Sequence, residues 1–180
     1  FFSIAHSDYI RLWVDSVQYM EGGPSDAEDE VSLIIRYSIV QSDFGVDLID
    51  ENNEDVNKIK SFRFSLGTFN DPIGLESDLG NIFSLIEVGP SRAKSDFEAF
   101  NPSDDNIEGF SEFYFAGNDT DGDGLENESS SAFLNLKLVY NSSNLDGQYL
   151  NIRDITNSLG AQTQFLIDQD GFDVEVDYQW

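Results

Sequence analysis

The segment that decides the fold is Val31–Val40, which reads VSLIIRYSIV. Every second residue from Val31 onward is apolar, and the residues between them include Ser32, Arg36 and Ser38. Alternation of this kind is typical of a strand with one face in a core and the other in water. The segment therefore predicts a half-buried β-strand.

The same period of two recurs along the chain, and only Ser91–Phe100 indicates a helical turn. Segments rich in Gly, Pro, Asn and Asp separate the apolar runs. The segments expected to form strands are Tyr9–Met20, Val31–Val40, Ile59–Leu66, Asn81–Val88, Gly109–Ala116, Ala132–Tyr140, Tyr149–Ile155, Thr163–Ile167 and Phe172–Trp180. The pattern predicts an all-β chain, with one domain over residues 1–180, built as a β-sandwich or jelly roll of about eight or nine strands.

The charge of the chain excludes two classes of partner. The sequence has 35 acidic residues against nine basic ones, and its formal net charge is -26. Nucleic acids and anionic membrane surfaces are bound through clustered Lys and Arg, so neither is an expected partner. Charge of one sign also repels itself in the folded state, so we expect stability to depend on salt or on cations held between carboxylates.

Catalytic residue types are scarce. The sequence contains no cysteine and a single histidine, His6, which excludes disulfides, a cysteine nucleophile and an ordinary zinc site. Pairs of carboxylates could serve a glycosidase, but among 35 acids some pair always lies close, so the signal is unspecific. The sequence therefore predicts a protein that is not an enzyme.

The beginning of the chain and its Asn-containing triplets indicate secretion. The sequence starts at Phe1 without an initiator Met, and it has no apolar stretch near the roughly 18 residues that would span a membrane. Asn118, Asn127 and Asn141 each stand in an acceptor triplet for N-glycosylation. We expect an extracellular or cell-surface protein.

The sharpest local motif is Asp119–Asn127, which reads DTDGDGLEN. Oxygen ligands at alternate positions, with a glycine after the third residue, match the first half of an EF-hand calcium loop. Position twelve, where that loop has a bidentate Glu, is Ser130, so we expect a shorter calcium loop. Its expected ligands are Asp119, Asp121, Asp123, Asn127 and Glu128. The alternative is a solvated Asp/Gly turn.

The aromatic residues have two expected uses. Several Phe residues fall on the apolar side of expected strands and are assigned to the core, namely Phe62, Phe64, Phe113 and Phe115. Trp13 and Trp180 are equally compatible with a protein interface and with a carbohydrate-binding face.

The order of these features resembles that of cohesin-like modules of bacterial and archaeal extracellular proteins. The resemblance rests on Trp13–Val17, the Val31 strand, Phe62–Leu66, Phe133–Val139, Leu150–Ile155 and Asp170–Val176. It implies a jelly-roll sandwich of about nine strands that holds proteins together without catalysis. The loops 41–58 and 67–80 are long for such a module, and nothing marks a dockerin-binding face. The Phe1-Phe2 pair is also similar to the start of camelysin/TasA-type fibre subunits.

Two function hypotheses follow from these observations. The first is a secreted, calcium-stabilised structural subunit that assembles with copies of itself into a filament, tube or surface layer, through strand addition at an open sheet edge. The alternative is a cohesin-like or carbohydrate-binding recognition module on the cell surface that binds another extracellular protein or a glycan. The unbroken alternation of Phe172–Trp180 favours the first, because such a strand could pair with a neighbouring subunit.

Overall fold

Strands are the dominant secondary structure of the described part of the chain, as seen in a computed structural model that describes residues 7–22, 29–43, 45–70, 75–77, 83–107, 110–122, 124–127, 131–140, 148–151, 164–167 and 173–179. The elements are β1 (Tyr9–Met20), β2 (Glu30–Val40), β3 (Ser61–Asn70), β4 (Leu75–Ser77), β5 (Phe83–Val88), α2 (Arg92–Ser95), β6 (Asn101–Ile107), β7 (Phe110–Asn118), β8 (Ala132–Tyr140), β9 (Gln148–Asn151), β10 (Gln164–Leu166) and β11 (Val176–Gln179). The single turn of α2 falls inside the expected helical segment. The predicted all-β class is confirmed.

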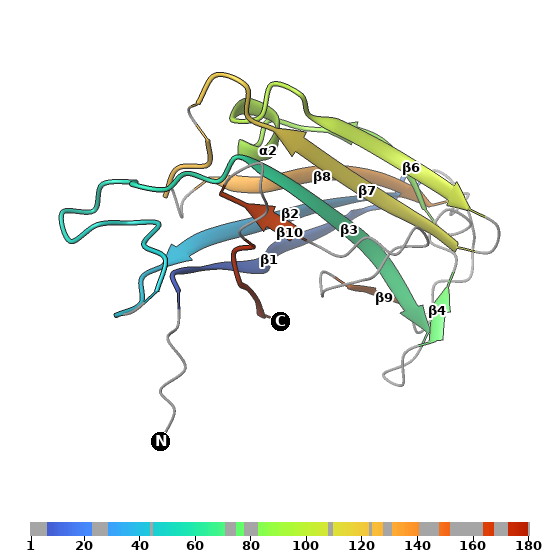
Figure 1. Cartoon of the computed structure of the whole chain (residues 1–180). Coiled ribbons are helices and arrows are strands. Elements are labelled where there is room, and N and C mark those ends of the chain that lie inside the picture. The colour runs from blue at the N-terminus through green and yellow to red at the C-terminus, as the bar shows by residue number, and fades with distance from the viewer. Residues whose placement is uncertain are drawn as a thin grey trace.

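The strands form two sheets that face each other (Figure 1). The first sheet has the order β11-β1-β2-β8-β5, and the second has the order β10-β3-β7-β6, with β4 and β9 also paired to β3. Neighbouring strands run antiparallel except β11, which lies parallel to β1. The arrangement is the predicted β-sandwich.

The core lies between the two sheets and is rich in aromatic rings. Buried and half-buried residues alternate along β2 without a fault, so the alternation read from its sequence is confirmed. The Phe133 ring from the first sheet lies 5.2 Å from Phe62 and 5.3 Å from Phe165, both in the second sheet. These edge-on and tilted contacts join the sheets, because aromatic pairs at such separations attract beyond the area they bury.

A β-bulge in β8 turns Phe133 into the core. Ile35 pairs with Leu134 and Arg36 pairs with Ala132, so Phe133 is an extra residue between these pairs. Phe133 and Leu134 are consecutive, and both have no exposed surface. Strict alternation along Ala132–Tyr140 would put Ala132 on the core face with Leu134 and Leu136, but the bulge leaves it half-buried opposite Arg36.

The C-terminal segment pairs within its own chain. Only Val176–Gln179 of the expected strand Phe172–Trp180 forms β11, and its residues lie in register with Ile10–Trp13 of β1. Val174, which precedes β11, is buried and donates its N–H to the carbonyl of Phe165 over 2.9 Å. The apolar face of this segment therefore helps to close the sandwich. Phe172 and Trp180 lie outside the described residues.

Strand β6 is not among the strands expected from the sequence, because Asn101-Pro102 is typical of a break between strands. The strand reads NPSDDNI, and it forms the edge of the second sheet beside β7. An edge strand tolerates Pro and acidic residues, because its outer side donates no hydrogen bonds to another strand and charge discourages further pairing. The segment therefore lacks the apolar alternation that marks the other strands.

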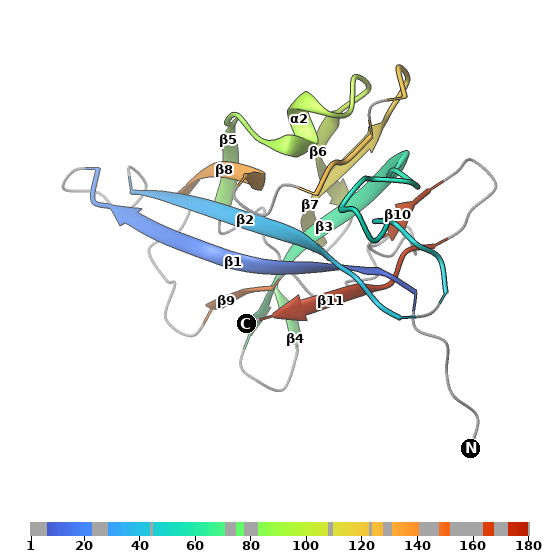
Figure 2. The same cartoon turned by 90° about the vertical axis from the view of Figure 1, so that its left-hand side faces the viewer.

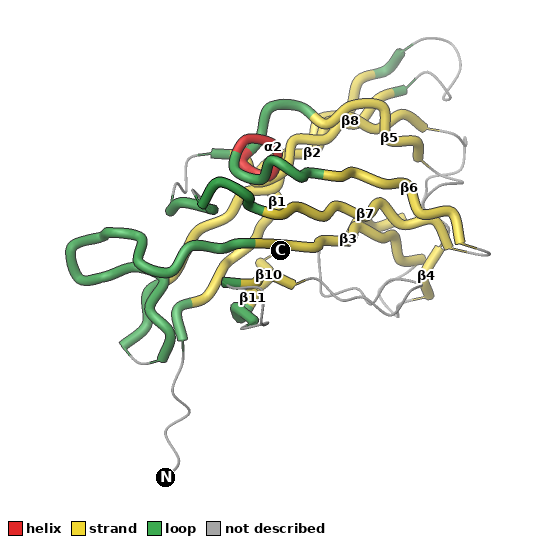
Figure 3. Tube along the Cα trace, turned by 45° about the horizontal axis from the view of Figure 1, so that its top comes forward, coloured by secondary structure: helices red, strands yellow, loops and turns green. Residues whose placement is uncertain are grey.

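Asp8 fixes the loop that connects β2 to β3. Its carboxylate is buried and accepts hydrogen bonds from the backbone N–H groups of Ser42 at 2.7 Å, Leu48 at 2.8 Å and Ile49 at 3.1 Å. Donors of this kind compensate the cost of burying a charge. Figure 3 shows this loop and α2 toward the same end of the sheets.

Candidate functional site

The predicted calcium loop lies at that end, in the turn that follows β7. The turn is held against the start of β3, because Asp119 donates its N–H to the Lys60 carbonyl at 2.8 Å and Leu125 donates to the Ile59 carbonyl at 3.3 Å. Gly124 has φ of 60°, and a Cβ there would lie 2.5 Å from Cβ of Lys58. Only glycine satisfies both the backbone conformation and this close approach.

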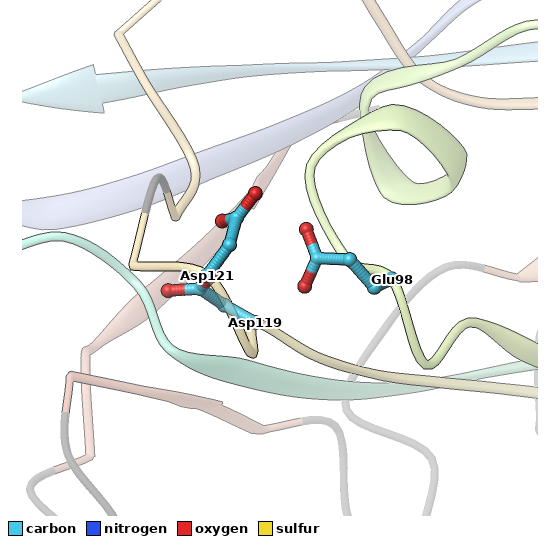
Figure 4. Close-up of side chains that lie close together, drawn as sticks. All are labelled: Glu98, Asp119 and Asp121. Atoms are coloured by element: carbon cyan, nitrogen blue, oxygen red, sulfur yellow. The ribbon is translucent and has the colours of Figure 1, made fainter.

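Two of the predicted ligands, Asp119 and Asp121, lie close to a third acid, Glu98, which the motif did not predict. Oxygen atoms of Glu98, Asp119 and Asp121 all lie within 4.8 Å of one another (Figure 4). Glu98 lies in the loop after α2, and its Oε2 accepts hydrogen bonds from N–H of Thr120 at 2.6 Å and from the Thr120 hydroxyl at 2.9 Å. We call Glu98, Asp119 and Asp121 the acidic cluster. No local spacing could have revealed Glu98, because it is distant from the motif in sequence.

Lys60 balances part of the charge of the acidic cluster. Its Nζ lies 2.8 Å from Oδ2 of Asp119 and 3.1 Å from the carbonyl oxygen of Gly122, while the Gly122 N–H donates to Oδ1 of Asp119 at 2.8 Å. The Asp119 side chain has no exposed surface. Burial alone would raise the pKa of Asp119, but the hydrogen bonds from Lys60 and Gly122 outweigh it and hold that pKa below its usual value.

The acidic cluster has the chemistry of a hard-cation site. The hydrogen bonds from the backbone and side chain of Thr120 lower the pKa of Glu98, so this carboxyl, like that of Asp119, is ionised at neutral pH. Calcium takes six to eight oxygen ligands in proteins, and carboxylates are its usual donors. The donor set fits this cation, although a cation bound to Asp119 would have to share it with Lys60.

The other predicted ligands do not join the acidic cluster in the described part of the chain. Asn127 lies against β2, where its Oδ1 accepts a hydrogen bond from N–H of Ile39 at 3.3 Å, and its own N–H donates to Asp55 at 3.3 Å. Asp123 and Glu128 lie outside the described residues. Of the glycosylation acceptors, Asn118 and Asn127 are exposed and Asn141 lies outside the described residues.

A second feature is a shallow hollow on the outer face of the β10-β3-β7-β6 sheet. In register across that face lie Gln164, Arg63 and Ala116, with Leu166, Ser61 and Asn118 in the adjacent row. The hollow has a volume of about 250 Å³, and these residues line it together with Phe62. We call this surface the Arg63 face.

Arg63 has a buried guanidinium Nε with no hydrogen-bond partner among the described residues. The Nε of Arg92 also lacks a well-aligned acceptor, but it lies 2.8 Å from Oδ2 of Asp96 in an ion pair, whereas no ion pair involves Arg63 in the described part of the chain. Six other bases form ion pairs with carboxylates, namely Arg11, Arg36, Lys58, Lys60, Arg92 and Lys137. Lys94 donates to the carbonyl oxygen of Val88 at 3.1 Å, and Arg153 lies outside the described residues. In a chain with 35 acids, a buried guanidinium Nε that meets no acceptor in the described residues is conspicuous.

A larger hollow of about 510 Å³ lies beside α2. The basic side chains in its described lining, Arg92 and Lys94, are bound to other groups of the protein. Arg92 contacts Asp96 at 2.8 Å and Glu126 at 3.4 Å, and Lys94 is bound to the backbone as described above. Burial raises the pKa of Asp96 above its usual value, against the opposing effect of Arg92. Among the described lining residues, the charge of Arg92 is therefore compensated by carboxylates, and Lys94 is bound to a backbone carbonyl.

The structure describes the side chains of three of the four Phe residues assigned to the core and of one of the two Trp residues. Phe62, Phe64 and Phe115 are buried, which confirms their assignment to the core. Trp13 is half-buried on the outer face of the first sheet, in register with Arg36. Trp180 and the side chain of Phe113 lie outside the described residues, as does His6.

Comparison with known proteins yields structural neighbours only. No protein-family model and no curated protein matches the chain. Within the described residues, the only helix is too short to cross a bilayer. One similar structure is a type I cohesin-dockerin complex, Coh-OlpC-Doc435 from Clostridium thermocellum, with a TM-score of 0.51 at 12% identity, over 99% of this chain and 94% of that chain. Another is the complex of CaDoc0917 with CaCohA2, with a TM-score of 0.51 at 11% identity and 94% coverage of both chains. The chain therefore has a cohesin-like β-sandwich fold.

Proposed function

We propose that this protein is a non-catalytic recognition module of the cell surface, which binds a partner protein through the Arg63 face. The observation that carries the proposal is the buried guanidinium Nε of Arg63, which lines a hollow and has no acceptor within the described part of the chain. A buried donor without an acceptor costs about 1–3 kcal/mol, and more when it is charged. A carboxylate or carbonyl oxygen of a partner would remove that cost on binding.

The fold supports this proposal over a self-assembling subunit. One of the similar structures is a complex of a cohesin with a dockerin, so this sandwich architecture is used elsewhere to hold a second protein. Strand β11, which was expected to pair with a neighbouring subunit, pairs on one side with β1 of its own chain and is an edge strand of the first sheet. The alternation of this segment is therefore accounted for without a neighbouring subunit.

Substitutions of Arg63 test the recognition proposal. Immobilised wild-type protein should retain a partner from the secreted and cell-surface proteins of its source, and Arg63→Glu should lose it because the introduced carboxylate repels an acceptor. With the partner purified, Arg63→Ala should weaken binding measured by calorimetry by about tenfold or more, the equivalent of one charged hydrogen bond. Arg36→Ala is the matched control, because Arg36 is paired with Asp15 on the outer face of the other sheet. Equal binding by Arg63→Glu and wild type would exclude the Arg63 face.

We further propose that calcium stabilises the protein at the acidic cluster. The supporting observation is the convergence of three carboxylates from two loops, together with the burial of Asp119 beside the ammonium group of Lys60. A ligand that binds only the folded state stabilises it by about 2.7 kcal/mol when its free concentration is a hundred times its dissociation constant.

Thermal unfolding of Asp121→Ala in calcium and in chelator tests this site. Calcium should raise the midpoint of the wild type, and it should raise the midpoint of Asp121→Ala much less because the variant lacks one ligand. Asp173→Ala, which removes an exposed acid elsewhere on the molecule, is the control for loss of charge alone. Equal shifts in all three proteins would place any calcium binding outside the acidic cluster.

A further inference from the structure

The hollow of about 510 Å³ beside α2 has the size of a small-molecule site. Its described wall is formed by the segment 90–95, which contains α2, and by residues 131 and 132, where β8 begins. In Figure 2, α2 lies next to β8 of the first sheet. We call this space the α2 hollow.

The wall of the α2 hollow is fixed by contacts of the protein itself. Gly89 donates its N–H to the carbonyl of Asn135 at 2.8 Å, which ties the entry to α2 to strand β8. The Arg92 side chain, which is 19% exposed, is held by Asp96 at 2.8 Å and by Glu126 at 3.4 Å. A preformed wall favours binding, because little conformational freedom is lost when a ligand arrives.

Ser91 brings a buried hydroxyl group to this wall. Its Oγ is buried and has no hydrogen-bond partner among the described residues. A serine that precedes the first turn of a helix usually accepts a hydrogen bond from that turn, but the Ser91 side chain makes no such bond. A buried hydroxyl that has lost water and gained no partner destabilises the folded state. Because rotation about one side-chain bond redirects the hydroxyl, a ligand in the α2 hollow can supply the missing partner.

The charges around the α2 hollow favour a neutral ligand. Arg92 is compensated by Asp96 and Glu126, so it attracts an anion only weakly. The ammonium group of Lys94 donates to the carbonyl of Val88 and is in no ion pair within the described part of the chain, so it repels a cation. The net charge of -26 repels anions at longer range. A ligand without charge avoids both repulsions.

We propose that the α2 hollow binds a neutral sugar residue of a glycan. A sugar ring presents C–H groups on its faces and hydroxyl groups at its edge. Pro90 and Ala132 in the wall offer apolar surface to a ring face, and Ser91 and Ser95 offer hydroxyl groups to the edge. The Ser95 hydroxyl donates to Asp96 at 2.6 Å, so its lone pairs can accept a hydrogen bond from the sugar. This proposal does not depend on the Arg63 face, which belongs to the other sheet.

The binding experiment uses the full chain, labelled with ¹⁵N, and four neutral disaccharides: cellobiose, maltose, lactose and diacetylchitobiose. At least one of them should bind saturably in a nuclear magnetic resonance titration. The amide signals of Ser91 and Ala132 should shift with the sugar concentration, whereas that of Ser61 should not, because Ser61 lines the hollow of the Arg63 face.

Ser91→Ala is the decisive variant, and Ser61→Ala is its matched control. Ser91→Ala should weaken sugar binding by about three- to tenfold, the equivalent of one neutral hydrogen bond. Its midpoint of thermal unfolding should stay the same or rise, because the substitution removes a hydroxyl that has no partner. Ser61→Ala should bind the sugar as the wild type does.

Several results would overturn the proposal. One is the absence of binding by all four disaccharides, and another is binding of an uncharged peptide of Ala and Ser in their place. Tighter binding of glucuronate than of the neutral sugars, lost in Lys94→Gln, would show that charge selects an acidic ligand. Equal weakening by Ser61→Ala would place the sugar in the hollow of the Arg63 face. A lower unfolding midpoint in Ser91→Ala with unchanged sugar affinity would make Ser91 a structural residue only.

Discussion

Asp119 is a buried carboxylate that the fold keeps ionised. Each of its oxygen atoms accepts a hydrogen bond, Oδ2 from Lys60 and Oδ1 from the Gly122 N–H. These bonds lower its pKa even though burial acts in the opposite direction. A carboxyl with a lowered pKa stabilises the folded state above the pKa of the unfolded chain, and that contribution is lost as the pH falls through the folded value.

We therefore predict that Asp119→Asn lowers the free energy of unfolding at neutral pH by about 1–2 kcal/mol, a charged hydrogen bond discounted because the Lys60 side chain is 36% exposed. The difference from wild type should shrink as the pH falls below about 4, the usual range of an aspartate pKa. Urea denaturation over a pH series measures it. A difference that stays constant with pH would mean that the charge of Asp119 is irrelevant.

Asp96 serves as a control, because its contribution to stability is expected to change with pH in the opposite direction to that of Asp119. Burial raises its pKa, so its contribution to stability is greatest at low pH and declines as the pH rises through the folded value. The wild type should therefore lose stability relative to Asp96→Asn as the pH rises, which is the reverse of the trend expected for Asp119→Asn.

At the scale of strands, the sequence predicted the elements that alternate and missed those that do not. The bounds of β1 and β8 agree with the prediction at both ends, because each strand packs one face on the core. The bulge at Phe133 could not be predicted from the local sequence, because Phe133 packs against the rings of Phe62 and Phe165, which lie in the other sheet. The spacing of the acidic motif predicted that Asp119 and Asp121 lie close together. Glu98 and Lys60 are distant from the motif in sequence, and the packing of separate segments brings them to it.

Gly117 in β7 packs closely against the side chains of Phe62 and Phe97, so a substitution there tests this packing. A Cβ at Gly117 would lie 2.5 Å from Cε1 of Phe62 and 2.8 Å from Cβ of Phe97. Gly117→Ala should therefore lower the free energy of unfolding by about 1–3 kcal/mol through overpacking. Chemical denaturation measures the loss. Ala116→Ser, at the half-buried outer position beside it, should change stability by much less. Unchanged stability in Gly117→Ala would mean that the rings of Phe62 and Phe97 move apart without cost.

At the scale of the whole molecule, charge and binding surfaces are distributed unevenly. The Arg63 face lies on the outside of the second sheet, and the acidic cluster lies in the turn after β7. The guanidinium Nε of Arg63, which meets no acceptor among the described residues, suits an acidic group, whereas the acidic cluster suits a cation.

The excess of carboxylates also sets how the whole fold responds to salt. With nine bases for 35 acids, most acidic side chains cannot have a basic side chain of their own to pair with, and they repel one another across the surface. Six bases form ion pairs in the described part of the chain. Salt screens charges on the surface over about 8 Å at physiological ionic strength, and it weakens the many repulsions more than the few attractions. We predict that the midpoint of thermal unfolding rises steadily with sodium chloride. Calcium chloride at matched ionic strength should add a further rise that saturates, and this extra rise should disappear in Asp121→Ala. A midpoint that falls as sodium chloride increases would instead show that the ion pairs, Lys60 with Asp119 foremost, outweigh the repulsion of the unpaired acids.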